Sequence, residues 1–353
     1  YFLKFDPKQY QTAMPYTPLG TLYAMSYLRE NGFEVKLFDT MFCNSAKDIE
    51  ATMDAYQPDI FISYDDGFNY LTKMCLTNMR EACFEMQQYA KTKGCKVITS
   101  SSDATDHAEE YLNHGSDVVV IGEAEQTVLE LCQAFKNNIA IEQIAGIATM
   151  KNSVLVKSNA RNVLKDLDTF PPPAWDLIDI NPYKNMWLSK HGYFSLNFVT
   201  TRGCPYKCNW CAKPIYGNRY NSHSPENIVL EIKKWQHQFG FTHVWFADDI
   251  FGLKPHWLKD FEHYTKKEKL SINYKIQSRA DLLLEEDNIE HLANSGCTMV
   301  WMGAESGSQK ILDAMDKGTK VEQIYEATCL FKKHGIGVSL FLQLGYLGET
   351  TED

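Results

Sequence analysis

Hydrophobic residues recur at two different spacings along the first 140 residues, and the two spacings alternate. Apolar positions three and four residues apart predict helices over 19–31, 46–56, 70–91, 105–113 and 123–135. Short apolar runs predict strands over 34–38, 59–63, 96–99 and 117–121. Strands that alternate with helices predict a parallel sheet with right-handed crossovers, and such sheets bind ligands beyond the carboxyl ends of their strands.

The same alternation begins again near residue 191. Strands are predicted over 196–200, 243–246, 273–277, 299–302 and 338–342, and helices over 225–239, 255–267 and 285–294, with two more before the last strand. Repeated units of strand and helix that close form a barrel, with its active site at the carboxyl ends of the strands. We therefore expect an α/β chain whose second half is a partial barrel.

A segment of different character separates the two regions. Residues 140–159 indicate a pair of strands, and the three consecutive prolines at 171–173 predict a stiff linker, because proline fits neither a helix interior nor a central strand. We predict a parallel-sheet domain over 1–138, a hairpin and proline-rich linker over 139–190, and the partial barrel over 191–353. The chain has no initiating Met and ends on what resembles the start of a helix, so we expect a truncated C-terminus and a longer natural protein.

Composition narrows the class of protein. The net charge of −10 argues against a nucleic-acid groove, which needs a basic face. No apolar run reaches the roughly 20 residues that span a bilayer. Ten cysteines are too few and too unevenly spaced for a disulfide scaffold, so we expect a reducing, cytoplasmic location. Seven of the ten are scattered through apolar or helical stretches, where we expect buried small hydrophobes.

The other three cysteines, Cys204, Cys208 and Cys211, form the spacing Cys-x3-Cys-x2-Cys in one loop. Thiolates are soft donors that suit iron. Four of them would close an iron–sulfur cluster, whereas three leave one iron of a cubane-type cluster without a protein ligand. The alternatives are a zinc site, for which His223 is poorly spaced as a fourth ligand, and three cysteines that coincide by chance.

Polar side chains follow several of the predicted barrel strands, where an active site is expected. They are Asp248, Arg279, Glu305 and Ser306. Each also has an alternative interpretation from its neighbours. Arg279 could pair with Asp281, the carboxylate of Asp248 could belong to a turn, and Glu305 and Ser306 could cap the next helix.

The cysteine loop, with Trp210 before its third cysteine, resembles the signature of the radical S-adenosylmethionine (SAM) superfamily. Residues 246–251, 277–281, 303–308 and 344–350 are similar to the motifs at successive strand ends of that family. The resemblance implies a [4Fe–4S] cluster on Cys204, Cys208 and Cys211, with SAM chelated to the open iron. It further implies that an electron from the cluster cleaves SAM to a 5′-deoxyadenosyl radical.

The resemblance also suggests which residues contact SAM. Arg279 offers a fork of donors to the methionyl carboxylate, and Ser306 can donate to the same group. Glu305 could accept from the ribose hydroxyls or the amino group, and Asp248 is a candidate ribose or substrate ligand. Trp210 could shield the adenine, or it could be a packing residue.

Residues 17–39, 58–63 and 117–125 resemble the Rossmann-like (flavodoxin-like) cobalamin-binding domain that precedes many radical SAM domains. The resemblance implies a bound cobalamin, with Asp39, Ser63 and Ser101 as candidate contacts. Two features depart from that family. Residue 41 is Met where a cobalt-ligating His would stand, and residues 100–103 replace a Gly-Gly-Pro turn with serines, which crowd a ligand. A fold retained without its cofactor is therefore the alternative.

Three functions follow as hypotheses. The first is methyl transfer from cobalamin to an unactivated carbon or phosphorus of a small molecule, which is the usual chemistry of this subclass. The second keeps the radical step but forms a ring oxidatively, without methyl transfer. The third is an iron–sulfur module without radical chemistry. The first two imply a reductant such as flavodoxin or ferredoxin as partner, and no nucleic acid or membrane span.

Overall fold

A computed structural model describes the chain except for residues 6, 65–75 and 214. The chain divides into two compact units, which are described separately. Unit 1 comprises Tyr1–Leu164 and Thr169–Gly192, with a short stretch near residue 215, and unit 2 comprises Lys165–Asp168, Tyr193–Lys213 and Gly217–Asp353. Most of the segment 139–190 thus packs within unit 1, and its role as a linker stays a prediction.

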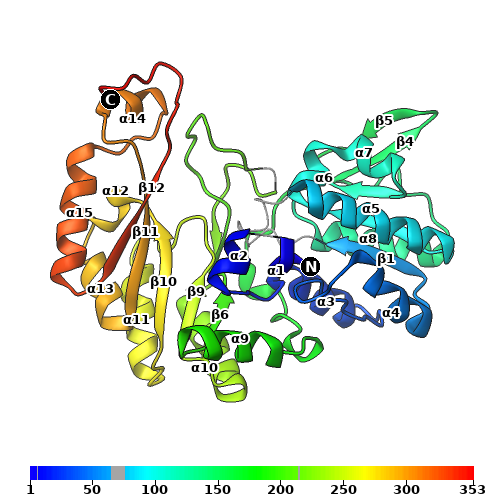
Figure 1. Ribbon diagram of the computed structural model, residues 1–353, viewed down its shortest axis with the longest axis horizontal. Coiled ribbons are helices and arrows are strands. Elements are labelled where there is room, and N and C mark those ends of the chain that lie inside the picture. Colours follow the sequence, from blue (N-terminus) through cyan, green and yellow to red (C-terminus); the bar gives the residue numbers. More distant parts are fainter. Residues whose placement is uncertain (6, 65–75, 214) are drawn as a thin grey trace. The chain divides into compact units, whose positions relative to one another are not determined.

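Unit 1 contains a five-stranded sheet in the order β1-β2-β3-β4-β5 (Figure 1). The strands β1, β2 and β3 are parallel, and β4 and β5 continue the sheet as an antiparallel hairpin. The predicted strands at 59–63, 96–99 and 117–121 and the predicted hairpin are therefore confirmed. The strands are β1 (Ile60–Tyr64), β2 (Lys96–Ser100), β3 (Val118–Val120), β4 (Ile147–Lys151) and β5 (Val154–Lys157).

Helices cover both faces of this sheet, because alternate residues of each strand are apolar on opposite faces. The helices α3 (Leu19–Glu30) and α8 (Glu125–Asn137) pack against the face that carries Ile60, Ile62 and Ile98. The opposite face carries Phe61, Val97 and Val119 and is covered by α4 (Ile49–Tyr56), α5 (Leu76–Thr92), α6 (Ser102–Asp106) and α7 (Ala108–Asn113). The other helical segments described up to residue 191 are α1 (Phe2–Phe5), α2 (Pro7–Thr12), η1 (Ala46–Asp48), η3 (Leu167–Thr169), η4 (Trp175–Leu177) and α9 (Asn181–His191), and the first two residues of η3 belong to unit 2.

Two predictions for unit 1 were wrong. Residues 34–38 have no strand assignment, because a strand exists only through hydrogen bonds to a neighbour and this segment has no strand partner in the described sheet. The helix predicted over 105–113 is two helices, since the backbone of His107 leaves helical geometry and the Ser101 side chain starts α6 earlier. The first residues of the helix predicted over 70–91 lie outside the described part, which shows α5 from Leu76.

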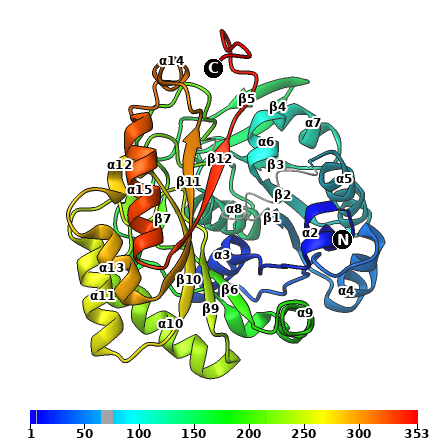
Figure 2. The same cartoon turned by 60° about the vertical axis from the view of Figure 1, so that its left-hand side comes forward.

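Unit 2 contains a five-stranded parallel sheet in the order β12-β11-β10-β9-β6, in which each strand neighbours the next strand of the same sheet along the chain. Figures 1 and 2 show α10, α11, α13 and α15 on one side of this sheet. The prediction of an α/β fold with parallel sheets is thus confirmed. The strands are β6 (Ser195–Phe198), β9 (His243–Phe246), β10 (Asn273–Ser278), β11 (Cys297–Glu305) and β12 (Gly337–Leu342), with a two-stranded ribbon of β7 (Thr201–Arg202) and β8 (Asn221–Ser222).

The helices of unit 2 follow their strands closely in sequence, as right-handed crossovers require. They are α10 (Pro225–Phe239), α11 (Trp257–Lys267), α12 (Ala280–Leu283), α13 (Asn288–Ser295), α14 (Gln309–Ala314) and α15 (Val321–Lys333). Ser224 caps α10, where its hydroxyl accepts from Asn227 N, and Pro225 follows at the first helical position, where proline fits. No helix in the part of the chain that the structure describes has the length and apolar character to cross a membrane.

Five aromatic rings form the core beneath β9 and β10. Phe246, Phe251 and Tyr274 contact Trp257 and Phe261 of α11, with ring centroids 4.7 Å apart for Phe246 and Phe251 and 5.2 Å apart for Trp257 and Phe261. All five rings are buried. Each such pair adds about 0.5–1.5 kcal/mol beyond the burial of its area. This cluster fixes the end of β9, which carries Asp248.

The glycine that ends α13 gives a test of the unit 2 packing. Gly296 has φ +103°, and a Cβ there would lie 2.2 Å from the carbonyl oxygen of Ile272. We expect Gly296→Ala to lower the free energy of unfolding by about 3 kcal/mol. The alanine would be strained at this positive φ, and the backbone at Ile272 would also have to move to make room for the Cβ. Gly335→Ala is the control: it has φ +75° and open space around its Cβ, so about 1 kcal/mol is expected. Urea denaturation measures both, and equal losses would contradict the packing described.

Candidate active site

The three cysteines of the motif lie in one irregular loop of unit 2. The loop leaves the ribbon strand β7 and returns through β8, and Gly203 starts it with a φ of +83° that favours glycine. Cys204, Cys208 and Cys211 are free thiols and are partly exposed. The amide of Cys211 donates to the carbonyl oxygen of Cys208 at 3.2 Å, which forms a turn between the second and third cysteine.

The tip of the loop is held by an asparagine that sequence reasoning missed. The Asn209 amide donates to the carbonyl oxygen of Met315 at 3.1 Å, and its side-chain nitrogen donates to that of Ala314 at 2.7 Å. Its side-chain oxygen accepts from the Tyr346 hydroxyl at 2.6 Å. Asn209 thus fixes the cysteine loop to the end of α14 and to the segment that follows β12.

Arg279 holds the loop from the end of β10. Its guanidinium stacks on the Tyr206 ring at 3.7 Å, and its Nη1 lies 3.9 Å from the Cys208 Sγ. Its Nε and Nη2 donate to the Asp281 carboxylate at 3.0 and 2.9 Å. The side chain is only 4% exposed, and the ion pair that the sequence left as an alternative is present.

The same guanidinium also binds the turn after α14. Its Nη2 donates to the carbonyl oxygen of Lys317 at 2.6 Å and to the Thr319 hydroxyl at 3.0 Å. Arg279 therefore joins β10, the cysteine loop and this turn in one network. With Nε and Nη2 engaged inside the protein, Nη1 is the donor that faces the loop.

Glu305, the last residue of β11, forms a buried ion pair with Lys317 at 2.9 Å. Its backbone has φ +63°, which is uncommon for a residue other than glycine. Gly303 leaves the room for this pair, because a Cβ there would lie 2.8 Å from the Lys317 Nζ. No local pattern indicated a role for Lys317, since lysines that follow a helix are usually exposed.

The polar groups of Ser306 and Asp248 form hydrogen bonds within the protein. The Ser306 hydroxyl accepts from the Ser308 amide at 3.1 Å and forms a turn before α14, whose N-cap is Ser308, so Ser306 does not cap this helix. The Asp248 carboxylate accepts from the amides of Thr200 and Thr201 at 2.8 and 2.6 Å and from both threonine hydroxyls at 3.1 and 2.7 Å. Asp248 thus ties the end of β9 to the residues that enter the cysteine loop, which favours the turn alternative.

The burial of Asp248 has an electrostatic consequence. The side chain is 1% exposed, and burial raises the pKa of Asp248 to about 7, although its four hydrogen bonds oppose that shift.

Trp210 lies in the cysteine loop and is 39% exposed, so it is no packing residue of the core. His223, the poorly spaced candidate for a fourth ligand, is buried and bonded to Asp168 at 3.0 Å.

The donor set of the loop fits a multi-iron cluster. Within the described ranges, no three His, Cys, Asp or Glu side chains converge on a position for a single metal ion. Three thiolates supply three of the four protein ligands that a [4Fe–4S] cluster takes, and each would bind a different iron. Burial raises the pKa of Cys204 and of Cys211, whereas the charge of Lys213 lowers both. Lys213 and the nearby Arg279 would offset the negative charge of bound thiolates.

The other seven cysteines divide by environment. All seven were predicted to be buried small hydrophobic residues. The prediction is confirmed for Cys83, Cys95, Cys132 and Cys297, which are buried. Cys43 is half-buried, and Cys329 is exposed on α15, so the prediction of burial was wrong for Cys329, which lies on the solvent side of its helix. Cys75 lies outside the described residues.

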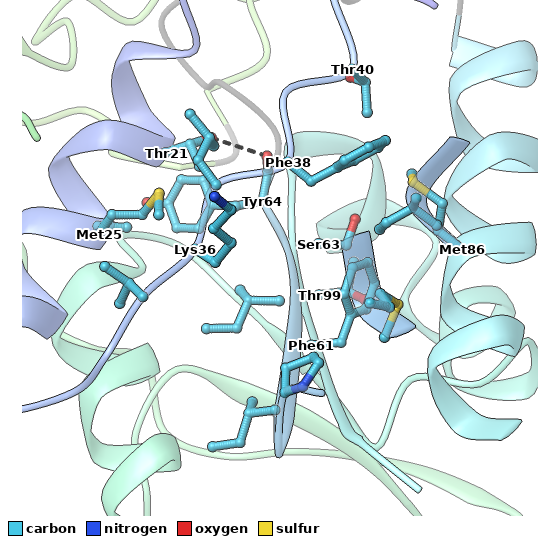
Figure 3. A pocket seen from close by; sticks show the side chains of 18 of the residues that line it. Thr21, Met25, Lys36, Phe38, Thr40, Phe61, Ser63, Tyr64, Met86 and Thr99 are labelled. Atoms are coloured by element: carbon cyan, nitrogen blue, oxygen red, sulfur yellow. Dashed lines mark hydrogen bonds between the residues drawn. The ribbon is translucent and has the colours of Figure 1, made fainter. Parts of the chain in front are cut away.

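In unit 1, the candidate cobalamin contacts line a cavity of about 930 Å³ (Figure 3). Asp39 accepts from the Tyr183 hydroxyl at 2.6 Å and from the Met41 amide at 3.0 Å, and burial raises the pKa of Asp39. The Ser63 hydroxyl lies 2.9 Å from the Cys83 Sγ, and the Ser101 hydroxyl accepts from the Ala104 amide as the cap of α6. All three side chains thus have partners within the unit.

The chain is similar to known proteins in both sequence and fold. Residues 198–353 match the family model described as the radical SAM superfamily. An uncharacterized methyltransferase of Pyrococcus horikoshii is 27% identical over 345 residues, which cover 95% of this chain and 71% of that protein.

Two solved structures share the fold. The cobalamin-dependent SAM radical enzyme OxsB, solved with aqua-cobalamin, has a TM-score of 0.76 at 22% identity over 95% of this chain and 48% of that one. The radical SAM methyltransferase TsrM of Kitasatospora setae, solved with tryptophan and a SAM analogue, has a TM-score of 0.78 at 17% identity over 96% of this chain and 67% of that one. The chain therefore spans about half the length of OxsB.

The pKa of Asp248 predicts a pH dependence of stability. The folded protein holds this proton to a higher pH than the unfolded chain, whose carboxyl has the ordinary value of 3.8. Its contribution to stability is therefore fully present below pH 3.8 and is lost as the pH rises through about 7. We expect Asp248→Asn to reduce the fall in the free energy of unfolding between about pH 5 and pH 8. Urea denaturation at each pH measures it, and the exposed Asp260→Asn should keep the original slope.

The network of Arg279 predicts a large effect of a substitution that keeps the charge. Lysine lacks the planar fork and the stacking surface of arginine, so we expect Arg279→Lys to lower the free energy of unfolding by about 2 kcal/mol. The control is Arg29→Lys, because Arg29 forms an exposed pair with Asp176, and about 0.5 kcal/mol or less is expected there. Urea denaturation compares the two, and equal effects would argue against the network.

Proposed function

We propose that this chain is the core of a cobalamin-dependent radical SAM methyltransferase, a proposal supported by the match of residues 198–353 to the radical SAM family model. Its substrate is a small molecule, methylated at an unactivated carbon or phosphorus. The observation that carries the proposal is the loop of three free cysteines, which Arg279 and Asn209 fix beside the carboxyl ends of β10 and β11. We further propose that the five-stranded sheet of unit 2 is part of a (β/α)6 barrel.

In this proposal Cys204, Cys208 and Cys211 hold a [4Fe–4S] cluster. When bound, that cluster supplies the electron for the reductive cleavage of SAM to a 5′-deoxyadenosyl radical. Arg279 orients Cys208 through its Nη1 and holds the loop through its stack on Tyr206. The guanidinium would also offset part of the negative charge of the bound thiolates.

The remaining candidates contact SAM or support the site. Trp210 presents an exposed ring beside Cys211, which suits contact with an adenine. One carboxylate oxygen of Glu305 accepts a hydrogen bond from Lys317. The other oxygen would accept from the ribose hydroxyls. Asp248 and Ser306, whose polar groups are bonded within the protein, act as positioning residues, and Asp248 fixes the entry to the cysteine loop.

Cobalamin is proposed for unit 1. The support is the similarity of fold to OxsB and TsrM over nearly the whole chain. Ser63 and Ser101 lie at the carboxyl ends of β1 and β2, the edge where such sheets bind ligands, and Asp39 lines the same cavity. Met41 stands where a histidine ligand would be, so cobalamin would bind without an imidazole from that motif. A flavodoxin or ferredoxin in the cytoplasm is the proposed reductant.

Substitution of the cysteines tests the cluster. After anaerobic reconstitution we expect about four iron atoms per chain and formation of 5′-deoxyadenosine from SAM under reducing conditions. Cys208→Ala should lower the rate of 5′-deoxyadenosine formation at least about 100-fold, because one iron of the cluster loses its protein ligand. Cys329→Ala is the matched control, since this thiol is exposed and outside the motif. Full activity of Cys208→Ala, or zinc in place of iron, would refute the proposal.

Product and cofactor analysis separates the function hypotheses. A product heavier by one methyl group, with a corrinoid extracted from the purified protein, supports methyl transfer. A product that has lost hydrogen supports an oxidative cyclase. If no 5′-deoxyadenosine forms, the remaining hypothesis is an iron–sulfur module without radical chemistry. Protein that retains no corrinoid after incubation with cobalamin contradicts the cobalamin part alone.

A further inference from the structure

The turn that follows the helix α14 carries a buried lysine. Lys317 is 6% exposed, and its Nζ donates to the Glu305 Oε1 at 2.9 Å. Lysine is almost never fully buried unless it is paired, because moving an ammonium out of water is costly. The burial of Lys317 therefore depends on Glu305, the last residue of β11, and the two residues have to be considered together.

The backbone of this turn determines where the ammonium lies. The Lys317 amide donates to the carbonyl oxygen of Leu312 at 3.1 Å, and the Asp316 amide donates to that of Asp313 at 3.1 Å. Asp316 has φ +51°, so these two bonds form the left-handed helix end known as a Schellman motif. The position of Lys317 in this motif often carries an apolar side chain that packs against the helix. Here the position carries a charge, which the turn directs to Glu305.

Arg279 fixes the same turn from the end of β10. Its Nη2 donates to the carbonyl oxygen of Lys317 at 2.6 Å, so the amide and the carbonyl group of Lys317 are both bonded. The Thr319 hydroxyl accepts from the same Nη2 at 3.0 Å and holds the far side of the turn. A side chain on a backbone that is held at both ends has few positions available. Lys317 therefore presents its charge at one place.

Glu305 is held in an uncommon geometry at the end of its strand. The pairing of β11 with β12 shifts register between Gly303 and Glu305, and a bulge of this kind re-aims a side chain. Glu305 also has φ +63°, which is strained for a residue other than glycine. Its carbonyl oxygen accepts from the Gln343 amide at 2.9 Å, which helps to hold this conformation. Backbone strain that the surroundings maintain is concentrated at functional sites.

Gly303 provides the space for the ion pair. A Cβ at Gly303 would lie 2.8 Å from the Lys317 Nζ and 2.9 Å from the Glu305 Oε1. The two bonded atoms therefore lie directly against the backbone of β11, where a larger residue would displace them. This contact encloses the Oε1 of Glu305, so its Oε2 is the oxygen that can accept from a ligand.

The ion pair determines which donor the second oxygen of Glu305 favours. The charge of Lys317 balances that of the carboxylate, so a second cation beside the pair gains little and is repelled by the ammonium. A neutral hydroxyl needs only an acceptor, and a carboxylate is a strong acceptor for it. A Glu305 that is paired with Lys317 therefore favours a neutral donor, such as a ribose hydroxyl, over a cationic amino group.

We propose that Lys317 is a positioning residue that fits Glu305 to the ribose hydroxyls of SAM. The inference rests on the proposed function, in which Glu305 contacts SAM. Lys317 keeps the carboxylate charged and in one orientation, and it makes the ribose, rather than the methionyl amino group, the donor to Glu305. When Lys317 is removed, a buried carboxylate without a counter-charge takes up a proton or turns toward water, and either change removes the acceptor.

Anaerobic equilibrium dialysis of the reconstituted enzyme tests the proposal with two ligands. SAM carries the ribose and the amino group, whereas 5′-methylthioadenosine carries the ribose without an amino or carboxylate group. We expect Lys317→Met, which keeps the length of the side chain but removes its charge, to weaken the binding of both ligands about 10-fold or more. Lys333→Met is the matched control, because Lys333 is exposed at the end of α15, and its affinities should equal those of the unchanged enzyme.

A double variant separates the positioning of Glu305 from the folding of the turn. Lys317→Met leaves a buried charge unpaired, whereas Glu305→Gln/Lys317→Met removes both charges and avoids that cost. If Lys317 acts on SAM through Glu305, the double variant binds both ligands as Glu305→Gln alone does, within about twofold. Losses that multiply in the double variant would show that Lys317 acts independently of Glu305, which contradicts the proposal. Iron content and urea denaturation of each variant show that it is folded and holds its cluster.

The outcomes distinguish this inference from the proposed function. If the unchanged enzyme cleaves SAM and Lys317→Met binds both ligands equally well, the inference is refuted and the proposed function stands. If Lys317→Met weakens the binding of SAM but not that of 5′-methylthioadenosine, Glu305 contacts the methionyl part, and the inference is again refuted. An unchanged enzyme that holds its cluster but neither binds nor cleaves SAM refutes the proposed function, and the role of Lys317 with it.

Discussion

The buried guanidinium of Arg279 is the contact on which the candidate site depends. It pairs with Asp281 on its own strand end, stacks on Tyr206, and reaches Cys208 through Nη1. A buried cation is costly unless its donors are bonded, so this arginine stays in place only while the cysteine loop and the turn at Lys317 are also in place. The order of the loop and the stability of unit 2 are therefore linked.

The polar residues at the strand ends divide into those that face the loop and those that hold the protein together. Asp248 is bonded fully to Thr200 and Thr201, and Glu305 is paired with Lys317. Both are buried acids at the end of a parallel strand, where open backbone groups and short loops need partners. A carboxylate at a strand end is thus no evidence for a ligand contact until its partners are known.

Unit 1 shows how a sheet depends on each of its strands. Residues 34–38 have the apolar alternation of a strand but form none, because a strand exists only beside a hydrogen-bonded neighbour. The cavity next to Ile60 and Ile62 is lined by residues of the helices on both faces of the sheet.

The sequence by itself determined the alternation of helices and strands, the parallel sheets and the cysteine loop, because hydrophobic period and cysteine spacing are local properties of the chain. It also named Arg279 and Asp248 correctly as residues at strand ends. Only the tertiary structure decided which residues the site residues contact. Examples are the ion pair of Glu305 with Lys317 and the hydrogen bond from Asn209 to the end of α14. These contacts join residues far apart in the chain, and their energies depend on burial and distance, which no local pattern contains.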